Sequence, residues 1–335
     1  MHKITVAGNM LADIVKVVEK YPDKGMLSTI TSLSRAVGGC VPNTAIDLKT
    51  IDPSLSVNVL GRVGQDEYGD YILGELQRHG IDISGVRRSA LPTSFSDVIT
   101  IKSTGERTFF TFRGANGEFC ADDIDIASLG CEIFHIGYIM LMDAFDRKDK
   151  EYGTALARFM KALREQGIKT SFDCVSESSG EFREKVVPVL RYTSYAILNE
   201  IESAAVSGIP ARNARGELVD DNIIRTMSYF LQCGVSEKVV IHAPEAGYLM
   251  DVSGYTVKVP SLDLPKGFIK GSVGAGDAFC AGCLYGFLTD MPDKEVLRFA
   301  AAAAASSLSK KDAVSGMGNK VEILALDSCF RKDPL

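Results

Sequence analysis

The sequence predicts a large α/β fold with a mainly parallel sheet, helices on both of its faces and a small separate sheet. The chain has 335 residues, of which 46% are hydrophobic and 24% charged, which is typical of one large globular domain or two modest ones. Short apolar runs alternate with helical patterns along almost the whole chain, as in βαβ units. Two β-rich segments interrupt this alternation, and they predict the second sheet.

The strands and helices are predicted from hydrophobic periodicity and from their flanking residues. Buried strands are expected at residues 3–8, 57–64, 132–139, 168–173, 195–200 and 238–243. Helices are expected at residues 44–50, 67–79, 152–166, 181–190, 220–233, 277–288 and 293–309. Within the last of these, the run Ala300–Ala305 predicts close packing against a neighbour, because alanine combines high helix propensity with little bulk.

The two segments that break the alternation are residues 10–35 and 93–113. The second resembles a hairpin around Ser103-Thr104-Gly105, and three phenylalanines (109, 110 and 112) lie close together in it. We expect the two segments to pair as a lid over a cleft; an extra hairpin at the edge of the main sheet is the alternative. The core would then comprise residues 1–9, 36–92 and 114–335.

Composition excludes several classes of protein. The 37 basic and 43 acidic residues give a net charge of −6, which argues against a nucleic-acid or anionic-membrane partner. The eight cysteines are spread over the chain rather than arranged as a disulfide framework, which favours a reducing, cytoplasmic location. No run approaches the roughly 20 apolar residues that a membrane span needs. Gly8, Asn9 and Asp13 interrupt any signal-peptide core.

The strongest local motif is KGSVGAGDAFCAGCLYGFL at residues 270–288. Its glycines, including Gly274 and Gly276, allow close backbone approach, and the free N–H groups of a helix start suit an anion. Asp277 follows directly and could accept a proton from a substrate hydroxyl while the neighbouring amides hold a phosphoryl group. An ordinary helix cap at Asp277 is an equally good interpretation of the spacing alone.

This motif differs from better-known glycine patterns. Its spacing is G-x-x-G-x-G, not the dinucleotide fingerprint G-x-G-x-x-G, and the chain has neither a P-loop motif nor G-x-S-x-G. Cys280 and Cys283 form a C-x-x-C pair inside the apolar helix without a second pair, so they are interpreted as core residues.

Three weaker motifs fall where ligands bind in parallel sheets. Asn199 and Glu202 follow a predicted strand and could hold Mg²⁺, or could simply begin a helix. Gly38-Gly39 and Asn43 could recognise sugar hydroxyls, or form a turn and a cap. Asp13 follows the first strand, and taken singly it is more typical of a solvated residue. Among the histidines, His135 is interpreted as a core residue, and His242 ends a strand.

Taken in order, these motifs resemble the ribokinase-like (PfkB) carbohydrate kinases over nearly the whole chain. The resemblance rests on VAGNMLADIV, VGGCVPNTA, GRVGQDEYGDYILGELQRHGIDISGV, GERTFFTFRGAN, NEIE and GAGD. It implies a three-layer α/β/α sandwich with a β-sheet lid, and ATP-dependent phosphorylation of a small sugar. A homodimer through the lid, a nucleoside as acceptor and a non-catalytic sugar sensor are further possibilities, whereas an NAD oxidoreductase lacks its glycine fingerprint here.

The resemblance also assigns roles to residues. Asp277 would be the catalytic base, with Gly274, Ala275 and Gly276 forming an anion hole. Asp13, Gly38, Gly39 and Asn43 would bind the sugar. Asn199 and Glu202 would organise Mg²⁺, and His242 and Gly247 would lie beside ATP.

Three departures from the family pattern bear on specificity. Gly271 and Ser272 replace the usual Asp–Thr pair, which argues against a family-type potassium site. The nucleotide turn T-L-G-x-x-G keeps only its last glycine, Gly247. Val175 and Glu177 replace the Asn and Arg of the D-x-N-x-R motif of many fructokinases and ketodeoxygluconate kinases, which counts against a standard fructokinase.

Overall fold

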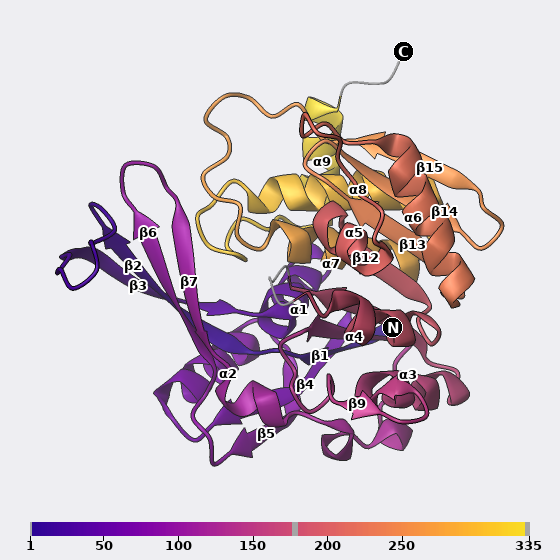
Figure 1. The fold of residues 1–335 in the computed structure, drawn as a ribbon, viewed down its shortest axis with the longest axis horizontal. Coiled ribbons are helices and arrows are strands. Elements are labelled where there is room, and N and C mark those ends of the chain that lie inside the picture. Colours follow the sequence, from indigo (N-terminus) through magenta and orange to yellow (C-terminus); the bar gives the residue numbers. More distant parts are fainter. Residues whose placement is uncertain (1, 176–179, 332–335) are drawn as a thin grey trace.

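A mixed sheet of nine strands runs through the centre of the computed structural model, which describes residues 2–175 and 180–331 (Figure 1). The strand order is β15-β14-β13-β12-β11-β8-β1-β4-β5. The strands from β13 to β5 are parallel, and β14 and β15 are added antiparallel at one edge. Their bounds are β1 (Lys3–Gly8), β4 (Ser56–Gly64), β5 (Asp82–Ser89), β8 (Ile133–Ile139), β11 (Lys169–Cys174), β12 (Tyr195–Asn199), β13 (Lys238–His242), β14 (Ala246–Asp251) and β15 (Thr256–Pro260).

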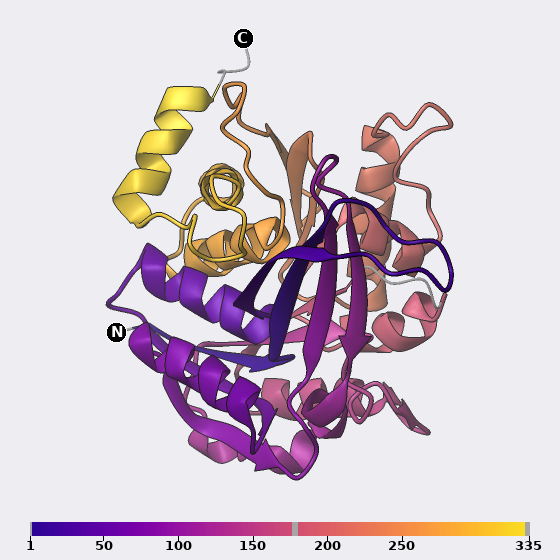
Figure 2. The same ribbon diagram turned by 90° about the vertical axis from the view of Figure 1, so that its left-hand side faces the viewer.

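Helices cover both faces of this sheet (Figure 2), and a hydrophobic core lies on each side of it. One core is shared with α1 (Cys40–Ile51), α2 (Glu67–Arg78), α7 (Ala275–Leu288), α8 (Asp293–Ser307) and α9 (Lys320–Phe330). The other is shared with α3 (Ala155–Glu165), α4 (Phe182–Leu190), α5 (Glu200–Ser207) and α6 (Asp220–Cys233). The predicted three-layer α/β/α class is therefore confirmed.

A separate four-stranded sheet projects from this body in the order β3-β2-β6-β7, at the left of Figure 1. It contains β2 (Leu11–Val18), β3 (Ile30–Gly38), β6 (Phe95–Ile101) and β7 (Arg107–Phe112), and we call it the lid sheet. The predicted hairpin turn lies between β6 and β7, where Gly105 has φ +74°. Two short strands, β9 (Lys148–Asp149) and β10 (Gly153–Thr154), form a further small ribbon.

The strand register divides the lid sheet into two faces, because residues opposite each other on paired strands point to the same side. Phe109 is opposite Val98 and shares its face with Arg107. Phe110 is opposite Asp97, and Phe112 is opposite Phe95, on the other face. The three phenylalanines that are close in sequence are thus separated by the pleat.

Close packing of small residues joins α7 to α8, as the alanine run predicted. A Cβ atom added at Gly282 would lie 2.6 Å from Cα of Ala300. Cys280 and Cys283 are buried free thiols in α7, so their interpretation as core residues is confirmed. Within the described ranges, no helix is both long and apolar enough to cross a membrane.

Candidate active site

The glycine-rich turn predicted to open a helix leads directly into α7. Gly274 is the N-cap residue and has φ +77°, a left-handed conformation that favours glycine. A Cβ atom at this position would also lie 2.6 Å from Cβ and from the carbonyl oxygen of Ala313. Both constraints explain why the turn needs glycine here. Asp277 is the third residue of the helix and not its cap, which leaves its carboxylate available for another use.

The first amides of α7 form a fan of donors. The Ala275 N–H lies 3.5 Å from the Ser272 carbonyl oxygen, the outer limit for a hydrogen bond. Within the described residues, the amides of Gly276 and Asp277 donate to no carbonyl group. Free amides at the start of a helix, with the positive end of its dipole behind them, bind anions such as phosphate.

Side chains from two distant elements hold the Asp277 carboxylate. Asn43 of α1 donates to Oδ2 over 2.9 Å, and Tyr138 of β8 donates to Oδ1 over 2.7 Å. Burial raises the pKa of Asp277 to about 6, and the two hydrogen bonds oppose that rise by stabilising the charged form. The acid is therefore mainly ionised at neutral pH yet more basic than a solvated aspartate. No motif in the sequence indicated Tyr138.

The residues predicted to bind sugar lie together beside this acid. Asp13 of β2 lies against the turn at Gly38, where an added Cβ atom would collide with its carboxylate. Burial raises the pKa of Asp13 to about 7; the nearby Arg107 lowers it and the charge of Asp277 raises it. Asp13 and Arg107 share the Phe109 face of the lid sheet, which identifies the face turned toward the site.

Two buried side-chain oxygen atoms near the predicted sugar-binding residues lack hydrogen-bond donors among the described residues. They are Oδ1 of Asn43 and Oδ1 of Asn9, and Asn9 was not among the residues predicted to bind a ligand. A Cβ atom at Gly39, which has φ +90°, would lie 2.5 Å from the Asn9 oxygen. A buried acceptor without a donor costs about 1–3 kcal/mol of stability. A ligand rich in hydroxyl groups could supply the missing donors, so it suits this part of the site.

Asn199 and Glu202 lie at the carboxyl end of β12, where α5 begins. The Asn199 side chain accepts from the amides of Ile201 (2.9 Å) and Glu202 (2.8 Å), and Glu202 accepts from the Asn199 amide (3.2 Å). They form the reciprocal capping box that the sequence left open as an alternative. Capping uses some of their acceptor capacity without removing them from the edge of the sheet.

The surroundings of Glu202 are acidic, which suits a cation such as Mg²⁺. Asp173 at the end of β11 is buried, and its pKa is well above the ordinary value because of that burial and of the charges on Glu202 and Asp277. A cation would relieve this excess of negative charge. No group of three or more His, Cys, Asp or Glu side chains in the described ranges could hold a metal alone. Mg²⁺ bound by one or two carboxylates together with substrate phosphates is nevertheless common.

His242 and Gly247 lie opposite each other on the hairpin of β13 and β14. The His242 ring stacks on Phe279 of α7 at 4.6 Å, and burial lowers its pKa to about 4, which keeps it neutral. Its Cε1 atom lies 3.8 Å from a Cβ atom added at Gly276, so the hairpin borders the amide fan. Val175 directly follows β11, whereas Glu177 is outside the described residues.

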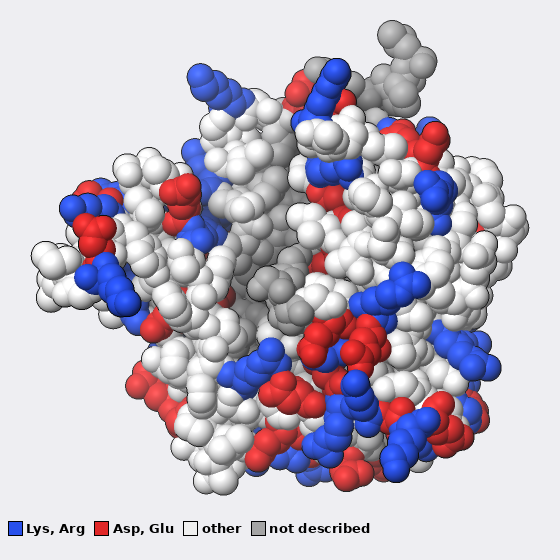
Figure 3. All heavy atoms as spheres, viewed as in Figure 1, with Lys and Arg blue, Asp and Glu red and all other residues white. Residues whose placement is uncertain are grey.

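The body is hollowed beside the lid sheet in Figure 3, and Lys, Arg, Asp and Glu are intermixed over that face.

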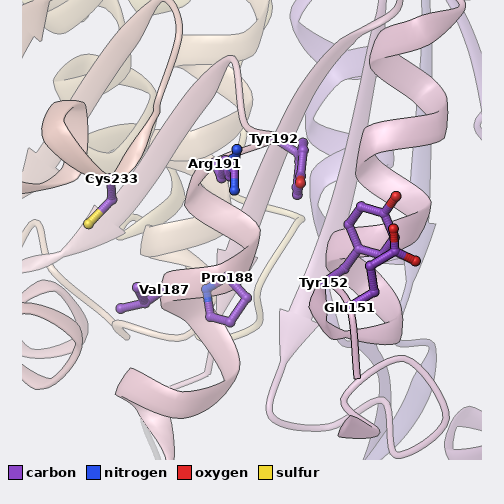
Figure 4. A pocket seen from close by; sticks show the side chains of 7 residues that line it. All are labelled: Glu151, Tyr152, Val187, Pro188, Arg191, Tyr192 and Cys233. Atoms are coloured by element: carbon purple, nitrogen blue, oxygen red, sulfur yellow. The ribbon is translucent and has the colours of Figure 1, made fainter. Parts of the chain in front are cut away.

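A different pocket of about 240 Å³ opens near α4. Its lining residues are Glu151, Tyr152, Val187, Pro188, Arg191, Tyr192 and Cys233 (Figure 4). This pocket contains none of the predicted site residues, so the candidate site is built from Asp277 and its neighbours and not from the pocket.

Comparisons with known proteins identify the family of the chain. Residues 1–319 match the model of the pfkB family carbohydrate kinases. Fructokinase-1 of Zea mays is 24% identical over 334 residues, with 95% of each chain covered. The 2-dehydro-3-deoxygluconokinase of Dickeya dadantii is 26% identical over 265 residues, with 75% of this chain and 81% of that protein covered.

Solved structures show the same fold. Ribokinase from Thermotoga maritima superposes with a TM-score of 0.80 at 22% identity, with 97% of this chain and 99% of that chain covered. Arabidopsis thaliana ribokinase, complexed with ribose and ATP, also has a TM-score of 0.80, at 21% identity and with 98% and 99% of the two chains covered.

Proposed function

This chain belongs to the pfkB family of carbohydrate kinases and is thus a phosphotransferase with an alcohol group as acceptor, and on that premise we propose its reaction and site. The proposed reaction transfers the γ-phosphoryl group of ATP to a primary hydroxyl of a small sugar. One observation carries the assignment of the site. The buried Asp277 carboxylate lies in the first turn of α7, beside amides that have no carbonyl partner within the described residues.

In this mechanism Asp277 orients the acceptor hydroxyl and takes its proton. The transition state of phosphoryl transfer is loose, so the acceptor hydroxyl loses its proton late. A carboxylate with a pKa of about 6 is therefore a strong enough base. The amides of Ala275, Gly276 and Asp277 stabilise the charge on the moving phosphoryl group. Gly274 permits the turn that aims them.

The phosphates of ATP would lie over the amide fan, beside the hairpin that carries His242 and Gly247. Asn199 and Glu202 would hold Mg²⁺, directly or through water, with the help of phosphate oxygens. When bound, Mg²⁺ neutralises charge on the β- and γ-phosphates. The proposal includes no potassium ion, because Gly271 and Ser272 stand in place of the family's Asp–Thr pair.

The sugar would bind between the lid sheet and α1. Asp13, the backbone of Gly38 and Gly39, and the Asn43 oxygen that lacks a donor within the described residues offer acceptors to its hydroxyl groups. An analogue that lacks one of these hydroxyls would leave a buried acceptor unpaired, which supports strong selection for polyhydroxylated substrates. Closure of the lid sheet would exclude water and suppress ATP hydrolysis.

The acceptor is identified by a panel assayed with ATP and Mg²⁺ through coupled ADP release. Fructose, ribose and 2-dehydro-3-deoxygluconate represent the relatives, and adenosine tests the nucleoside alternative. We expect a free sugar to be preferred to a nucleoside. Of the three phenylalanines in β7, only Phe109 shares the Asp13 face of the lid sheet, so a single ring is available to stack on a base. Faster turnover of the nucleoside than of every sugar would favour the alternative.

Asp277→Asn tests the assigned base. The amide keeps the size of the side chain but cannot accept the proton, so turnover should fall by at least about 10²-fold, the scale of general acid–base effects. Calorimetry should show ATP and sugar binding with little change. An Asp277→Asn enzyme with near-normal turnover would contradict the assignment.

Two further features complete the proposal. Copies of the chain would pair through the face of the lid sheet that carries Phe110 and turns away from the site.

A cytoplasmic location is supported by the cysteines, since all eight lie within the described residues and are unpaired, as expected in a reducing compartment.

A further inference from the structure

Tyr138 contacts the proposed catalytic base although it belongs to none of the motifs. Its hydroxyl donates to Oδ1 of Asp277 over 2.7 Å, while Asn43 donates to Oδ2 over 2.9 Å. Its ring packs partly buried against the core of the α1 and α7 side. We propose that Tyr138 is a positioning residue of this kinase, which fixes the orientation of the Asp277 carboxylate and keeps it ionised. This inference rests on the proposed function.

The geometry gives each donor a separate task. A carboxylate offers about four lone-pair positions on two oxygens, and one donor on each oxygen fixes the plane of the group. The remaining lone pairs are then presented in one direction, toward the acceptor hydroxyl. Loss of the Tyr138 donor would leave Asn43 alone to define the orientation, and the carboxylate could then rotate about its own axis.

The charges around Asp277 explain why a donor is needed there. The titratable groups that face it are Asp13 from β2, Cys40 and Asp47 from α1, Asp173 from β11 and Cys280 from α7. All of them are acids or thiols, and Arg107 faces Asp13 rather than Asp277. Among the described side chains, the hydrogen bonds from Tyr138 and Asn43 are therefore what favours the charged form.

The test is the pH profile of kcat/KM for the best sugar, which reports the ionisation of the free enzyme. In Tyr138→Phe the acidic limb should move upward by about one pH unit, because loss of a hydrogen bond to a charged group raises the pKa of that group. Activity would then fall about fivefold relative to the unmodified protein at pH 6 and change little at pH 8. Asp13 titrates in the same range, but it receives no hydrogen bond from Tyr138 in the described structure.

Tyr248→Phe is the matched control, because the Tyr248 hydroxyl donates to Oδ1 of Asp220 over the same 2.7 Å on β14, and Asp220 belongs to α6. It should leave the acidic limb in place. Tyr138→Met provides a second side chain without a hydroxyl, and it should shift the limb in the same direction as Tyr138→Phe. In an Asp277→Asn background, Tyr138→Phe should cause no further loss of turnover, because Tyr138 acts through the carboxylate.

An acidic limb that stays within about 0.2 pH units in both variants, or a full additional loss in the Asp277→Asn background, would overturn the inference. Failure of the proposed function is a different outcome. In that case the unmodified protein would release no ADP with any acceptor of the panel.

Discussion

Asp47 shows how a single residue of α1 can affect stability without touching substrate. It lies one turn after Asn43 and is fully buried, and both of its carboxylate oxygens lack a donor within the described residues. Burial, together with the charges of Asp277 and Asp312, raises its pKa well above the ordinary value. The folded protein therefore holds a proton that the unfolded chain releases above about pH 4, so folding stability falls as the pH rises from there.

Asp47→Asn should remove this dependence, because the amide has the same shape and does not ionise. Relative to the unmodified protein, we expect the variant to gain about 1–3 kcal/mol more at pH 8 than at pH 5, measured by urea unfolding. Asp23→Asn, at an exposed position, is the control and should show no such difference. Equal effects of Asp47→Asn at the two pH values would mean that the residue is ionised in the folded state.

The contact between Tyr138 and Asp277 marks the limit of prediction at the residue scale. Gly274, Asp277 and the turn at Gly38-Gly39 could be found from sequence, because glycines directly before a predicted helix indicate a tight turn at that point. The Tyr138 hydroxyl reaches Asp277 across 139 positions, through the packing of β8 beside α7. No local spacing encodes a contact of that kind.

At the scale of elements, the lid sheet carries different chemistry on its two faces. Phe109 shares a face with Arg107, and both are on the side of Asp13. Phe110 lies on the opposite face, and both phenylalanines are more than half exposed. The sequence predicted the hairpin from its turn residues, but the facing of each side chain depends on the register with β6 and β2.

Phe109→Ala and Phe110→Ala form a matched pair, because they remove the same ring from adjacent positions of β7. Phe109→Ala should raise the KM for sugar by about 5- to 50-fold, through the loss of roughly 1–2.5 kcal/mol of apolar contact in the closed lid. Phe110→Ala should leave that KM unchanged. Steady-state kinetics measures both values, and an equal rise in the two variants would contradict the assignment of the faces.

The accuracy of element prediction followed the strength of the apolar pattern. β1 (Lys3–Gly8) and α6 (Asp220–Cys233) have the predicted bounds, since one is a buried run and the other has a clear apolar stripe. α9 (Lys320–Phe330) was not predicted; it buries only Ile323 and Asp327, so its sequence has little periodicity. α5 (Glu200–Ser207) was considered only as a helix start at the NEIE motif.

At the scale of the whole molecule, the outward face of the lid sheet raises the question of what covers it. Leu33 is 67% exposed and Phe110 is 55% exposed on this face. Lys16 and Asp97 lie between these two apolar side chains and form an ion pair with an N–O distance of 2.5 Å. A surface on which one positive and one negative side chain lie among exposed apolar side chains is complementary to itself. A two-fold axis can place Lys16 of one copy near Asp97 of another. These features favour a second copy of the chain as the occupant.

Sedimentation at micromolar concentration should therefore give the mass of a dimer. Leu33→Asp places an uncompensated charge in the apolar field and should shift the protein toward monomer. Asp97→Lys should do the same, because it sets like charges against each other across the axis. The swap Lys16→Asp with Asp97→Lys restores opposite charges and should restore the dimer. A monomeric unmodified protein, or a Leu33→Asp variant that remains fully dimeric, would exclude pairing through this face. None of these substitutions removes a residue that holds the Asp277 carboxylate, since its donors Asn43 and Tyr138 belong to the same chain as the acid.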